Sequence, residues 1–280
     1  MKVLINFADS KFRKQQLRNT KTALTTGGFD KVIEYSYEDI DSAYLKSHDD
    51  ILSTARGSGL WLWKPYFINK TFEVLNDGDY LFYCDAGSYF VDSIDLLISC
   101  MEANSLDIMP FECPLINLQF SKREFISANN CEESWLYGNQ IIGTFLLLKV
   151  SDKSRFIINE FLRMCEIREL ICDSDSLETQ HPMFIDHRHD QTILSYLMWK
   201  HKIAGYRDPS QYGFLPLEYI KFGLFNKDCC LGKFRNYNLS TYPMILYHYR
   251  KRNIGDLIRR KLFEIKTNLK ILISPKVQKD

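Results

Sequence analysis

The first fifty residues alternate short apolar runs with polar segments of helical length. Residues 3–8 predict a buried strand, and residues 31–35 predict a second one. Residues 12–24 between them predict a helix, and residues 37–46 predict a further short helix. A strand–helix–strand beginning of this kind favours a parallel sheet joined by right-handed crossovers. The first predicted strand is not followed by a G-x-G-x-x-G sequence, which argues against a dinucleotide-binding opening.

The same alternation continues through most of the chain, apart from a long glycine- and aromatic-rich segment at residues 208–242. A capping-box pattern, Ser121-x-x-Glu124, predicts that a helix begins there. The other predicted strands are residues 80–84, 107–110, 141–150, 203–207 and 244–249, and the other predicted helices are residues 65–75, 92–103, 151–171 and 192–200. The whole pattern predicts an α/β fold.

The predicted strand at residues 80–84 stops abruptly at an acidic residue, Asp85. In open α/β sheets, ligands bind outside the carboxyl ends of the strands. A carboxylate there can hold a divalent cation beside a diphosphate. The small residues Ala86 and Gly87 follow, so a bulky anionic ligand could approach the backbone. The alternative is an acidic turn after a core strand.

Two tryptophans at alternate positions, Trp61 and Trp63, follow a Gly-Ser-Gly sequence and precede Pro65, which suits the first turn of a helix. Large rings beside Arg56 and Lys64 predict a wall of a substrate cleft, with one of the two basic side chains facing phosphate. The alternative is that both tryptophans are buried in the core.

Residues 181–191 hold the densest group of polar side chains, and a predicted helix follows directly. Asp190 and Gln191 therefore lie at a helix start, where backbone amides and the helix dipole favour an anionic partner. The alternative is that Asp190 only caps the helix. His187 and His189 form an H-x-H pair, but the spacing of the other histidines and cysteines does not support a zinc site.

The composition is that of a soluble globular protein large enough for one α/β domain. The 280 residues are 45% apolar and 25% charged, and no apolar run approaches the length of a membrane span. The eight cysteines form no C-x-x-C pair, which favours a reducing compartment. The N-terminal apolar run is too short for a signal peptide, so we expect a cytoplasmic protein or one bound to the inner face of the membrane.

The net charge of +1 is unevenly distributed, because ten of the 31 residues from Arg250 to Asp280 are Lys or Arg and only three are acidic. Apolar residues recur at helical spacing in this tail, which predicts a basic amphipathic helix able to bind an anionic membrane surface. The alternative is a helix packed on the domain. Basic residues concentrated in an apolar-patterned tail argue against nucleic-acid binding.

Three segments together, residues 59–66, 83–87 and 187–191, resemble bacterial GT-A-type glycosyltransferases of capsule and lipopolysaccharide O-antigen assembly. The resemblance implies a GT-A-like single domain, with a mainly parallel central sheet flanked by helices and a C-terminal basic amphipathic helix. The catalytic domain would span residues 1–250, with a nucleotide-sugar half at about 1–110 and an acceptor half at about 111–250. Residues 251–280 would be the tail.

The resemblance also assigns roles to individual residues. Asp85 occupies the first position of an aspartate-x-aspartate metal motif and Gly87 the second, so Mn²⁺ or Mg²⁺ would rest on Asp85 and on His248. Asp190 and Gln191 would be the catalytic residues and face the transferred sugar. The expected nucleotide-sugar-binding residues are Ala8, Asp9, Arg56, Lys64, Asp85, Ala86, Gly87, Arg250 and Arg252. The expected acceptor-binding residues are Trp61, Trp63, Gln140, His187 and His189.

The function that follows from the resemblance is transfer of a hexose from a nucleotide sugar to a saccharide or lipid-linked saccharide. The resemblance points to UDP as the nucleotide and to galactose as the transferred hexose. Asp190 would stabilise the sugar at its face or act as a general base on the acceptor, and both roles remain open. The rival classes are a nucleotidyltransferase and a non-catalytic carbohydrate-binding protein. A nucleotidyltransferase normally has a glycine-rich basic loop after the first strand, which residues 7–10 do not provide.

Overall fold

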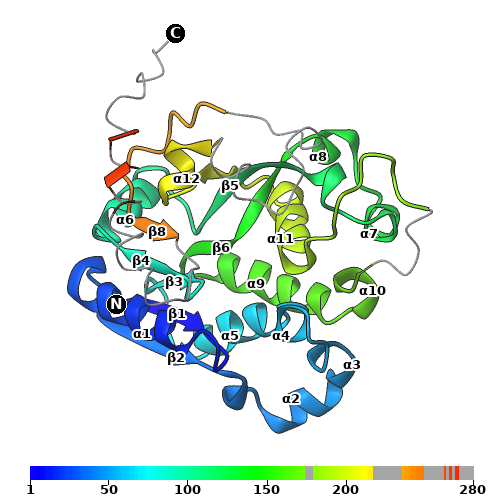
Figure 1. Ribbon diagram of the computed structural model, residues 1–280, viewed down its shortest axis with the longest axis horizontal. Helices are drawn as coiled ribbons and strands as arrows, with labels where there is room; N and C mark the ends of the chain where they lie inside the picture. The colour runs from blue at the N-terminus through cyan, green and yellow to red at the C-terminus, as the bar shows by residue number, and fades with distance from the viewer. Residues whose placement is uncertain (174–178, 217–234, 249–261, 263–264, 267–268, 271–280) are drawn as a thin grey trace.

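The computed structural model of the chain describes residues 1–173, 179–216, 235–248, 262, 265–266 and 269–270. In this part of the chain, a six-stranded sheet runs in the order β2-β1-β3-β6-β5-β7 (Figure 1). Its strands are β1 (Lys2–Phe7), β2 (Lys31–Tyr35), β3 (Tyr80–Cys84), β5 (Ile108–Ile116), β6 (Asn139–Lys149) and β7 (Tyr206–Arg207). The two predicted halves of the domain thus contribute strands to one sheet.

Strand β6 is the only described member of this sheet that runs against the others. It is antiparallel to β3 and to β5, whereas β1 is parallel to β2 and β3, and β5 is parallel to β7. The sheet is therefore mainly parallel, as predicted. A second, two-stranded sheet pairs β4 (Ser88–Phe90) antiparallel with β8 (Leu246–His248). This pairing brings residues 246–248 back to the segment that follows β3.

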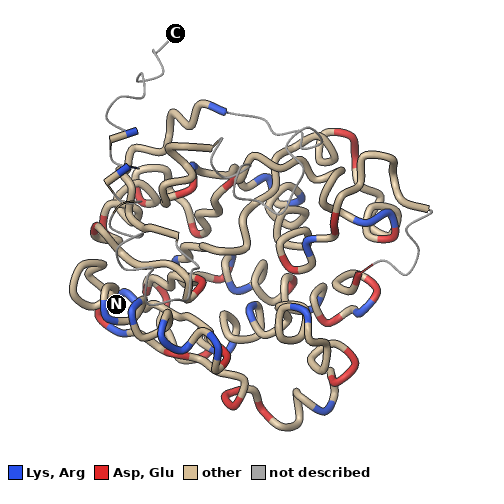
Figure 2. The backbone as a smooth tube through the Cα atoms, in the orientation of Figure 1, with Lys and Arg blue, Asp and Glu red and all other residues tan. Residues whose placement is uncertain are grey.

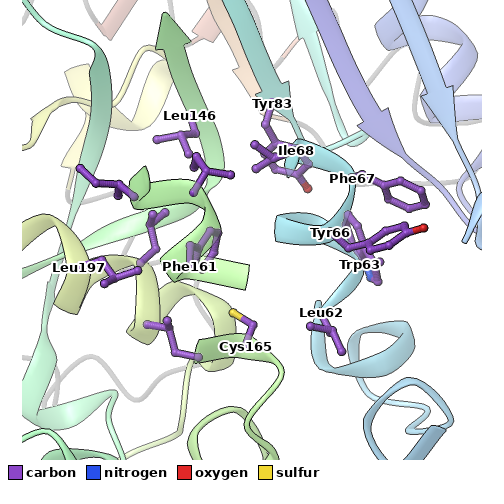
Figure 3. Close-up of a cluster of buried hydrophobic side chains, with 14 of the residues drawn as sticks. Leu62, Trp63, Tyr66, Phe67, Ile68, Tyr83, Leu146, Phe161, Cys165 and Leu197 are labelled. Atoms are coloured by element: carbon purple, nitrogen blue, oxygen red, sulfur yellow. The ribbon is translucent and has the colours of Figure 1, made fainter. Parts of the chain in front are cut away.

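Helices cover both faces of the central sheet, because alternate residues of its strands point to opposite sides. On β3, Leu81 and Tyr83 join the core beneath α5 (Trp63–Phe72), α9 (Asp152–Cys165) and α11 (His189–Lys200). Figure 3 shows part of this cluster. On the other face, Phe82 and Cys84 pack with α6 (Asp95–Ala103) and with the π-helical turn Ala23–Gly27 that ends α1 (Arg13–Thr22).

The remaining helices are short. They are α2 (Ser42–Ser47), α3 (Asp49–Leu52), α4 (Gly57–Leu60), α7 (Arg123–Ala128), α8 (Glu133–Leu136), α10 (Arg168–Ile171) and α12 (Gln211–Phe214), with 3₁₀ turns at Tyr37–Asp39 and Asn117–Gln119. Several of them lie where the sequence predicted longer helices or loops.

Several predicted elements differ from the structure. The helix at 37–46 is divided into the 3₁₀ turn Tyr37–Asp39 and α2, and the strand at 203–207 is reduced to β7. The strand at 107–110 is longer, since β5 continues to Ile116 as a fully buried run. The helix at 151–171 is interrupted at residues 166–167, between α9 and α10. The helix at 192–200 begins three residues earlier, at His189. A helix does begin at this point, as predicted, but the capping box is wrong, because Lys122 and not Ser121 is the N-cap of α7 and no side chain makes a capping hydrogen bond there.

Basic and acidic residues are both distributed along the described chain, and several Lys and Arg residues lie along α1 (Figure 2). No helix among the described residues is both long and apolar enough to cross a membrane. In the tail, the described residues are helical, and Leu262, Ile265 and Leu269 are 54–61% exposed. Most of the predicted amphipathic helix, including Arg250 and Arg252, lies outside the described residues.

Candidate active site

Asp85 directly follows β3, at the carboxyl end of the strand, as the sequence predicts. Its backbone amide donates to the Thr144 carbonyl of β6 at 3.0 Å. The Tyr83 hydroxyl donates to Asp85 Oδ1 at 2.5 Å. The carboxylate is half-buried, and the next residue, Ala86, is buried. We call residues 85–88 the Asp85 turn. It presents a carboxylate, held by a tyrosine hydroxyl, at the edge where α/β proteins bind ligands.

A buried ion pair joins the first turns of two helices beside this strand end. Lys64 of α5 and Asp190 of α11 are each 4% exposed, and the Lys64 ammonium donates to Asp190 Oδ2. The same ammonium donates to the Gly143 carbonyl at 2.7 Å. Burial raises the pKa of the Asp190 carboxyl, even though Lys64 acts in the opposite direction. The capping interpretation of Asp190 is therefore wrong, since Arg188 is the N-cap and the carboxylate binds a lysine.

Tyr83 stands between the two carboxylates. Its hydroxyl binds Asp85, and its ring centroid lies 5.2 Å from Lys64 Nζ, on the side of the Lys64–Asp190 pair. The negative charge of Asp85 also contributes to the raised pKa of Asp190, so the two acids are electrostatically linked. Two carboxylates, one half-exposed and one buried, thus share one site across a tyrosine and a lysine.

Gly143 allows the buried pair to approach strand β6 closely. A Cβ atom at this position would lie 3.0 Å from Lys64 Nζ and 3.2 Å from Asp190 Oδ2. The Gly143 amide donates to Gln191 Oε1 at 3.0 Å, and Gln191 Nε2 donates to Gln140 Oε1 at 2.7 Å. Both ends of the Gln191 amide are therefore engaged with the protein. Gln191 and the fully buried Gln140 hold α11 against β6, and Gln140 is not accessible to an acceptor in this structure.

A left-handed turn places Lys64. All five residues from Gly57 to Trp61 have positive φ, with values between 52° and 94°. Three of them, Ser58, Leu60 and Trp61, are not glycine, and each such residue is disfavoured by about 1–2 kcal/mol. Strain of this kind persists where the surroundings enforce it, and it is concentrated at functional sites. The Gly-Ser-Gly sequence indicated an unusual backbone path, but not that it extends to Trp61.

The two tryptophans have different environments. Trp63 is 5% exposed, stacks on Phe7 with centroids 3.9 Å apart, and donates to the Gly57 carbonyl at 3.0 Å. The core alternative is therefore correct for Trp63, and the assignment of this residue to an acceptor site is not supported. Trp61 is partly exposed and lies between Gly57 and the ring of His189, whose centroid is 5.1 Å away. It links the left-handed turn to the residue that precedes Asp190.

His187 and His189 are anchors for the segment that leads into α11. Both are 1% exposed. His187 Nε2 donates to the Leu170 carbonyl at 2.9 Å, and His189 Nδ1 donates to the Ile171 carbonyl at 2.7 Å. Burial lowers the pKa of both imidazoles, so the neutral forms are favoured. Neither ring is open to an acceptor, so the structure does not support an acceptor-binding role for either.

Three expected nucleotide-binding residues are engaged elsewhere. Arg56 forms ion pairs with Asp173 at 2.7 Å and Asp186 at 2.8 Å, so two carboxylates already neutralise it. Ala8 is buried, and Asp9 Oδ1 accepts hydrogen bonds from the next turn's backbone amides, at 2.9 and 3.1 Å. Of these three residues, Arg56 is the least suited to bind phosphate in this structure, because a phosphate group would have to displace both carboxylates.

The expected metal ligands lie at the same end of the sheet. The pairing of β4 with β8 sets His248 opposite Ser88, the last residue of the Asp85 turn. The His248 ring packs on Phe145, with centroids 6.0 Å apart, and Phe145 pairs with Cys84 just before Asp85. Within the described residues, no three His, Cys, Asp or Glu side chains form a metal cage. This donor set fits a cation that is bound mainly by a diphosphate and water, as Mg²⁺ often is.

Lys64 was expected to face phosphate, and its pairing with Asp190 was not predicted from the sequence. A signal was present, because Lys64 lies inside the apolar run from Leu60 to Tyr66. A lysine in such a run that is buried requires an acidic partner. The tyrosine hydroxyl that binds Asp85 was missed because Tyr83 looks like an ordinary strand residue in sequence.

No protein-family model and no curated protein sequence matches this chain. Among solved structures, it is similar to mouse xyloside xylosyltransferase 1, with 10% identity, a TM-score of 0.45, and coverage of 91% of this chain and 97% of that one. It is also similar to the galactosyltransferase LgtC in complex with donor and acceptor sugar analogues, with 12% identity, a TM-score of 0.49 and 96% coverage of both chains. A third is the glycosyltransferase GlyE of Streptococcus pneumoniae, with 11% identity, a TM-score of 0.42, and coverage of 98% and 64%. Because these TM-scores are below 0.5, the proposal below rests on the site geometry.

Proposed function

We propose that this protein is a glycosyltransferase that moves a hexose from a nucleotide sugar to a saccharide acceptor. The observation that carries the proposal is the pair of linked carboxylates at the strand ends: Asp85, half-exposed after β3, and Asp190, buried against Lys64. Glycosyl transfer from a nucleotide sugar has two demands. A departing diphosphate needs positive charge, and an oxocarbenium-like sugar needs a negative group at its face.

Asp85 serves the first demand. Its carboxylate is half-buried at the sheet edge and accepts a hydrogen bond from the Tyr83 hydroxyl. A Mn²⁺ or Mg²⁺ ion that enters with the donor would be held by Asp85, with His248 as the second protein ligand. Such an ion supplies electrostatic stabilisation of the leaving diphosphate. Arg250 and Arg252, which lie outside the described residues, stay proposed contributors of positive charge.

Asp190 serves the second demand. Lys64 and Gly143 fix the position of its carboxylate, so little reorganisation is needed when charge develops on the sugar. Gln191 is a positioning residue, because its amide holds Gly143 and Gln140. A carboxyl with a raised pKa beside a lysine can also exchange a proton with an acceptor hydroxyl. The anomeric configuration of the product distinguishes these two roles.

The proposal is tested by incubating the protein with a panel of UDP-, GDP- and dTDP-linked sugars, with and without Mn²⁺. Release of nucleoside diphosphate from one donor, lost in Asp190→Asn, supports it. A nucleotidyltransferase would instead release pyrophosphate from a nucleoside triphosphate and a sugar phosphate. Binding of oligosaccharide without cleavage of any donor would favour the carbohydrate-binding class. We propose UDP-galactose as the donor to test first, with an acceptor from bacterial surface polysaccharide.

The site of action is a separate proposal. Leu262, Ile265 and Leu269 are exposed at helical spacing, and Lys266 and Lys270 directly follow Ile265 and Leu269 in the sequence. Each basic residue near an anionic leaflet contributes about 1 kcal/mol. We therefore propose that the protein binds the cytoplasmic membrane surface through residues 251–280.

The full chain should sediment with anionic vesicles and be released by high salt. A chain ending at Arg252 should remain in the supernatant and still cleave donor; equal vesicle binding by both would exclude the anchor.

A further inference from the structure

A continuous chain of buried amide side chains runs from strand β1 through helix α1 to the Asp85 turn. Gln16 Nε2 donates to Asn6 Oδ1 at 3.0 Å, and Asn6 Nδ2 donates to Asn19 Oδ1 at 2.7 Å. Asn19 Nδ2 then donates to the Ser88 carbonyl at 3.0 Å and to Cys84 Sγ at 3.3 Å. Asn6, Gln16 and Asn19 are each at most 1% exposed. The chain therefore crosses the interior and ends on both flanks of Asp85.

The burial of these amides needs a reason beyond stability. An amide taken out of water is unfavourable unless it is hydrogen-bonded, and even then apolar residues of the same shape would be about as stable. The neighbouring positions of β1, Ile5 and Phe7, are apolar and pack normally. Asn6 is thus a polar exception on the strand, and its partners are residues that lead to the Asp85 turn. Fully satisfied polar networks fix a unique geometry in a way that apolar contacts do not.

The contacts of Asn19 reach the backbone of Asp85 itself. Cys84 Sγ, which accepts from Asn19, in turn donates to the Asp85 carbonyl at 3.5 Å. The same carbonyl accepts from the Ser88 amide at 3.1 Å, which closes the turn. Asn19 thereby holds the turn at its first and last residues.

The Asn19 amide also affects the position of His248, through Ser88. Ser88, whose carbonyl Asn19 binds, is the residue that pairs with His248 between β4 and β8. A shift of Ser88 would move the two expected ligands, Asp85 and His248, relative to each other. Side chains that orient ligands in this way typically matter 10–100-fold for affinity.

We propose that Asn19 is the positioning residue for the diphosphate–cation site, and that Asn6 and Gln16 hold Asn19 in register from behind. Asn19 itself touches no ligand. It acts by fixing the distance between the Asp85 turn and β8. This inference rests on the proposed function for its ligand, a nucleoside diphosphate with a divalent cation. Its structural part, the control of the turn by Asn19, does not depend on that function.

The test compares Asn19→Ala with a matched control, Asn117→Ala. Asn117 is 2% exposed and donates to two carbonyls, those of Trp135 at 2.9 Å and Gly138 at 3.3 Å, but lies far along the chain from the Asp85 turn. Both substitutions remove a buried asparagine whose amide nitrogen donates two hydrogen bonds. A general loss of stability would therefore appear in both variants, whereas a positioning effect would appear in one.

Two quantities are measured in the full chain. The first is hydrogen exchange of the Asp85 and Ser88 backbone amides without ligand. The second is the affinity for UDP in the presence of Mn²⁺, measured by calorimetry. Asn19→Ala should accelerate exchange of these amides and weaken UDP–Mn²⁺ binding by about tenfold or more. Asn117→Ala should leave both close to wild type. If Asn19→Ala does not fold, Asn19→Ser, which keeps a polar group of smaller size, is measured instead.

Wild-type exchange at the Asp85 turn in the Asn19 variant would overturn the inference, as would an equal effect of Asn117→Ala. Faster exchange with unchanged UDP–Mn²⁺ affinity would also overturn it, because the turn would then not position the ligands. Failure of the wild-type protein to bind any nucleoside diphosphate would instead contradict the proposed function. The exchange measurement would still decide the structural role of Asn19 in that case.

Discussion

The two carboxylates of the site are held in opposite ways. Asp85 follows a regular strand and is half-buried; its carboxylate accepts a hydrogen bond from the Tyr83 hydroxyl, and the amide of Asn19 contacts the preceding residue, Cys84. Asp190 is 4% exposed and is bound by the ammonium of Lys64, which follows the left-handed turn at residues 57–61. One acid is supported by hydrogen bonds, and the other by a buried charge and a strained backbone.

The difference indicates that the two carboxylates have different roles. A carboxylate that is oriented but open can receive a hydrated cation and its phosphates. A carboxylate that is buried against a lysine keeps a fixed position, since moving either charge into an apolar space is unfavourable. We infer that Asp85 is built for binding and Asp190 for chemistry. The predictions below separate these roles, from the largest expected effect to the smallest.

Asp190→Asn keeps the shape of the side chain and removes its charge. We expect kcat to fall by roughly 10²–10⁴-fold, since a positioned charge or proton acceptor contributes about that much. The KM for the donor should change little. Steady-state kinetics on the responding nucleotide sugar gives both quantities. A variant with a raised KM and wild-type kcat would place Asp190 among the binding groups.

Lys64→Met leaves the Asp190 carboxylate buried without its cation. Removal of one partner of a buried pair costs about 3–5 kcal/mol, so the midpoint of chemical denaturation should fall sharply. The double variant Lys64→Met, Asp190→Leu should recover most of this stability and none of the activity. If the single variant is as stable as wild type, the pair is not a fixed element of the site.

Asp85→Asn should lower the rate of transfer by roughly 10²–10³-fold, because one group that stabilises developing charge is removed. Its melting temperature should stay near the wild-type value, since the side chain is half-exposed. Extra Mn²⁺ should recover part of the activity of this variant. Wild-type turnover at saturating donor would remove Asp85 from the mechanism.

Gly59→Ala tests the left-handed turn that places Lys64. The residue has φ +94°, and a Cβ would lie 2.8 Å from the Leu52 Cα. Gly78→Ala is the matched control, since Gly78 has φ +86° and open space around it. The control should lose about 1–2 kcal/mol from backbone strain alone, and Gly59→Ala should lose more. The free energy of unfolding of both variants is measured by chemical denaturation. Equal losses in the two variants would show that the close approach of Gly59 to Leu52 does not hold the turn.

The buried histidines predict the smallest effect, a pH dependence of stability. Burial lowers the pKa of His187 and His189 in the folded state, so the unfolded chain binds more protons. Their contribution to stability is present above the ordinary histidine pKa of about 6.5 and is lost as pH falls towards the folded value. The free energy of unfolding should therefore decrease below about pH 6.5 by up to about 1.4 kcal/mol per pH unit for each histidine. A His187→Gln variant with the same slope would contradict this.

The strands 31–35 and 80–84 were predicted to the residue, because polar residues bound each apolar run. The direction of β6 was not predictable, since local periodicity is the same in parallel and antiparallel strands. The start of α11 was missed because His189, Asp190 and Gln191 are polar yet buried, and polar residues at a helix start resemble a loop in sequence.

For the site, sequence reasoning placed the two carboxylates in the fold but did not find their contacts. It put Asp85 at a strand end and Asp190 at a helix start, and the structure has both residues there, while their roles stay predictions. It could not find the Lys64 pairing or the role of Asn19, because both depend on segments that meet only in the fold, 126 and 69 positions apart for Lys64–Asp190 and Asn19–Ser88. It assigned Trp63 and the two histidines to the acceptor, where burial in the core is the simpler outcome for such residues.

The central claim, that Asp190 acts in bond cleavage and not in binding, is tested most directly by two measurements on one sample of Asp190→Asn. Calorimetry gives its affinity for the donor sugar nucleotide, and proton NMR follows cleavage of the bond between sugar and diphosphate. The account predicts donor affinity within a few-fold of wild type and cleavage slowed by at least about 10²-fold. Cleavage at the wild-type rate, or loss of donor binding with unchanged cleavage of the bound donor, would contradict it.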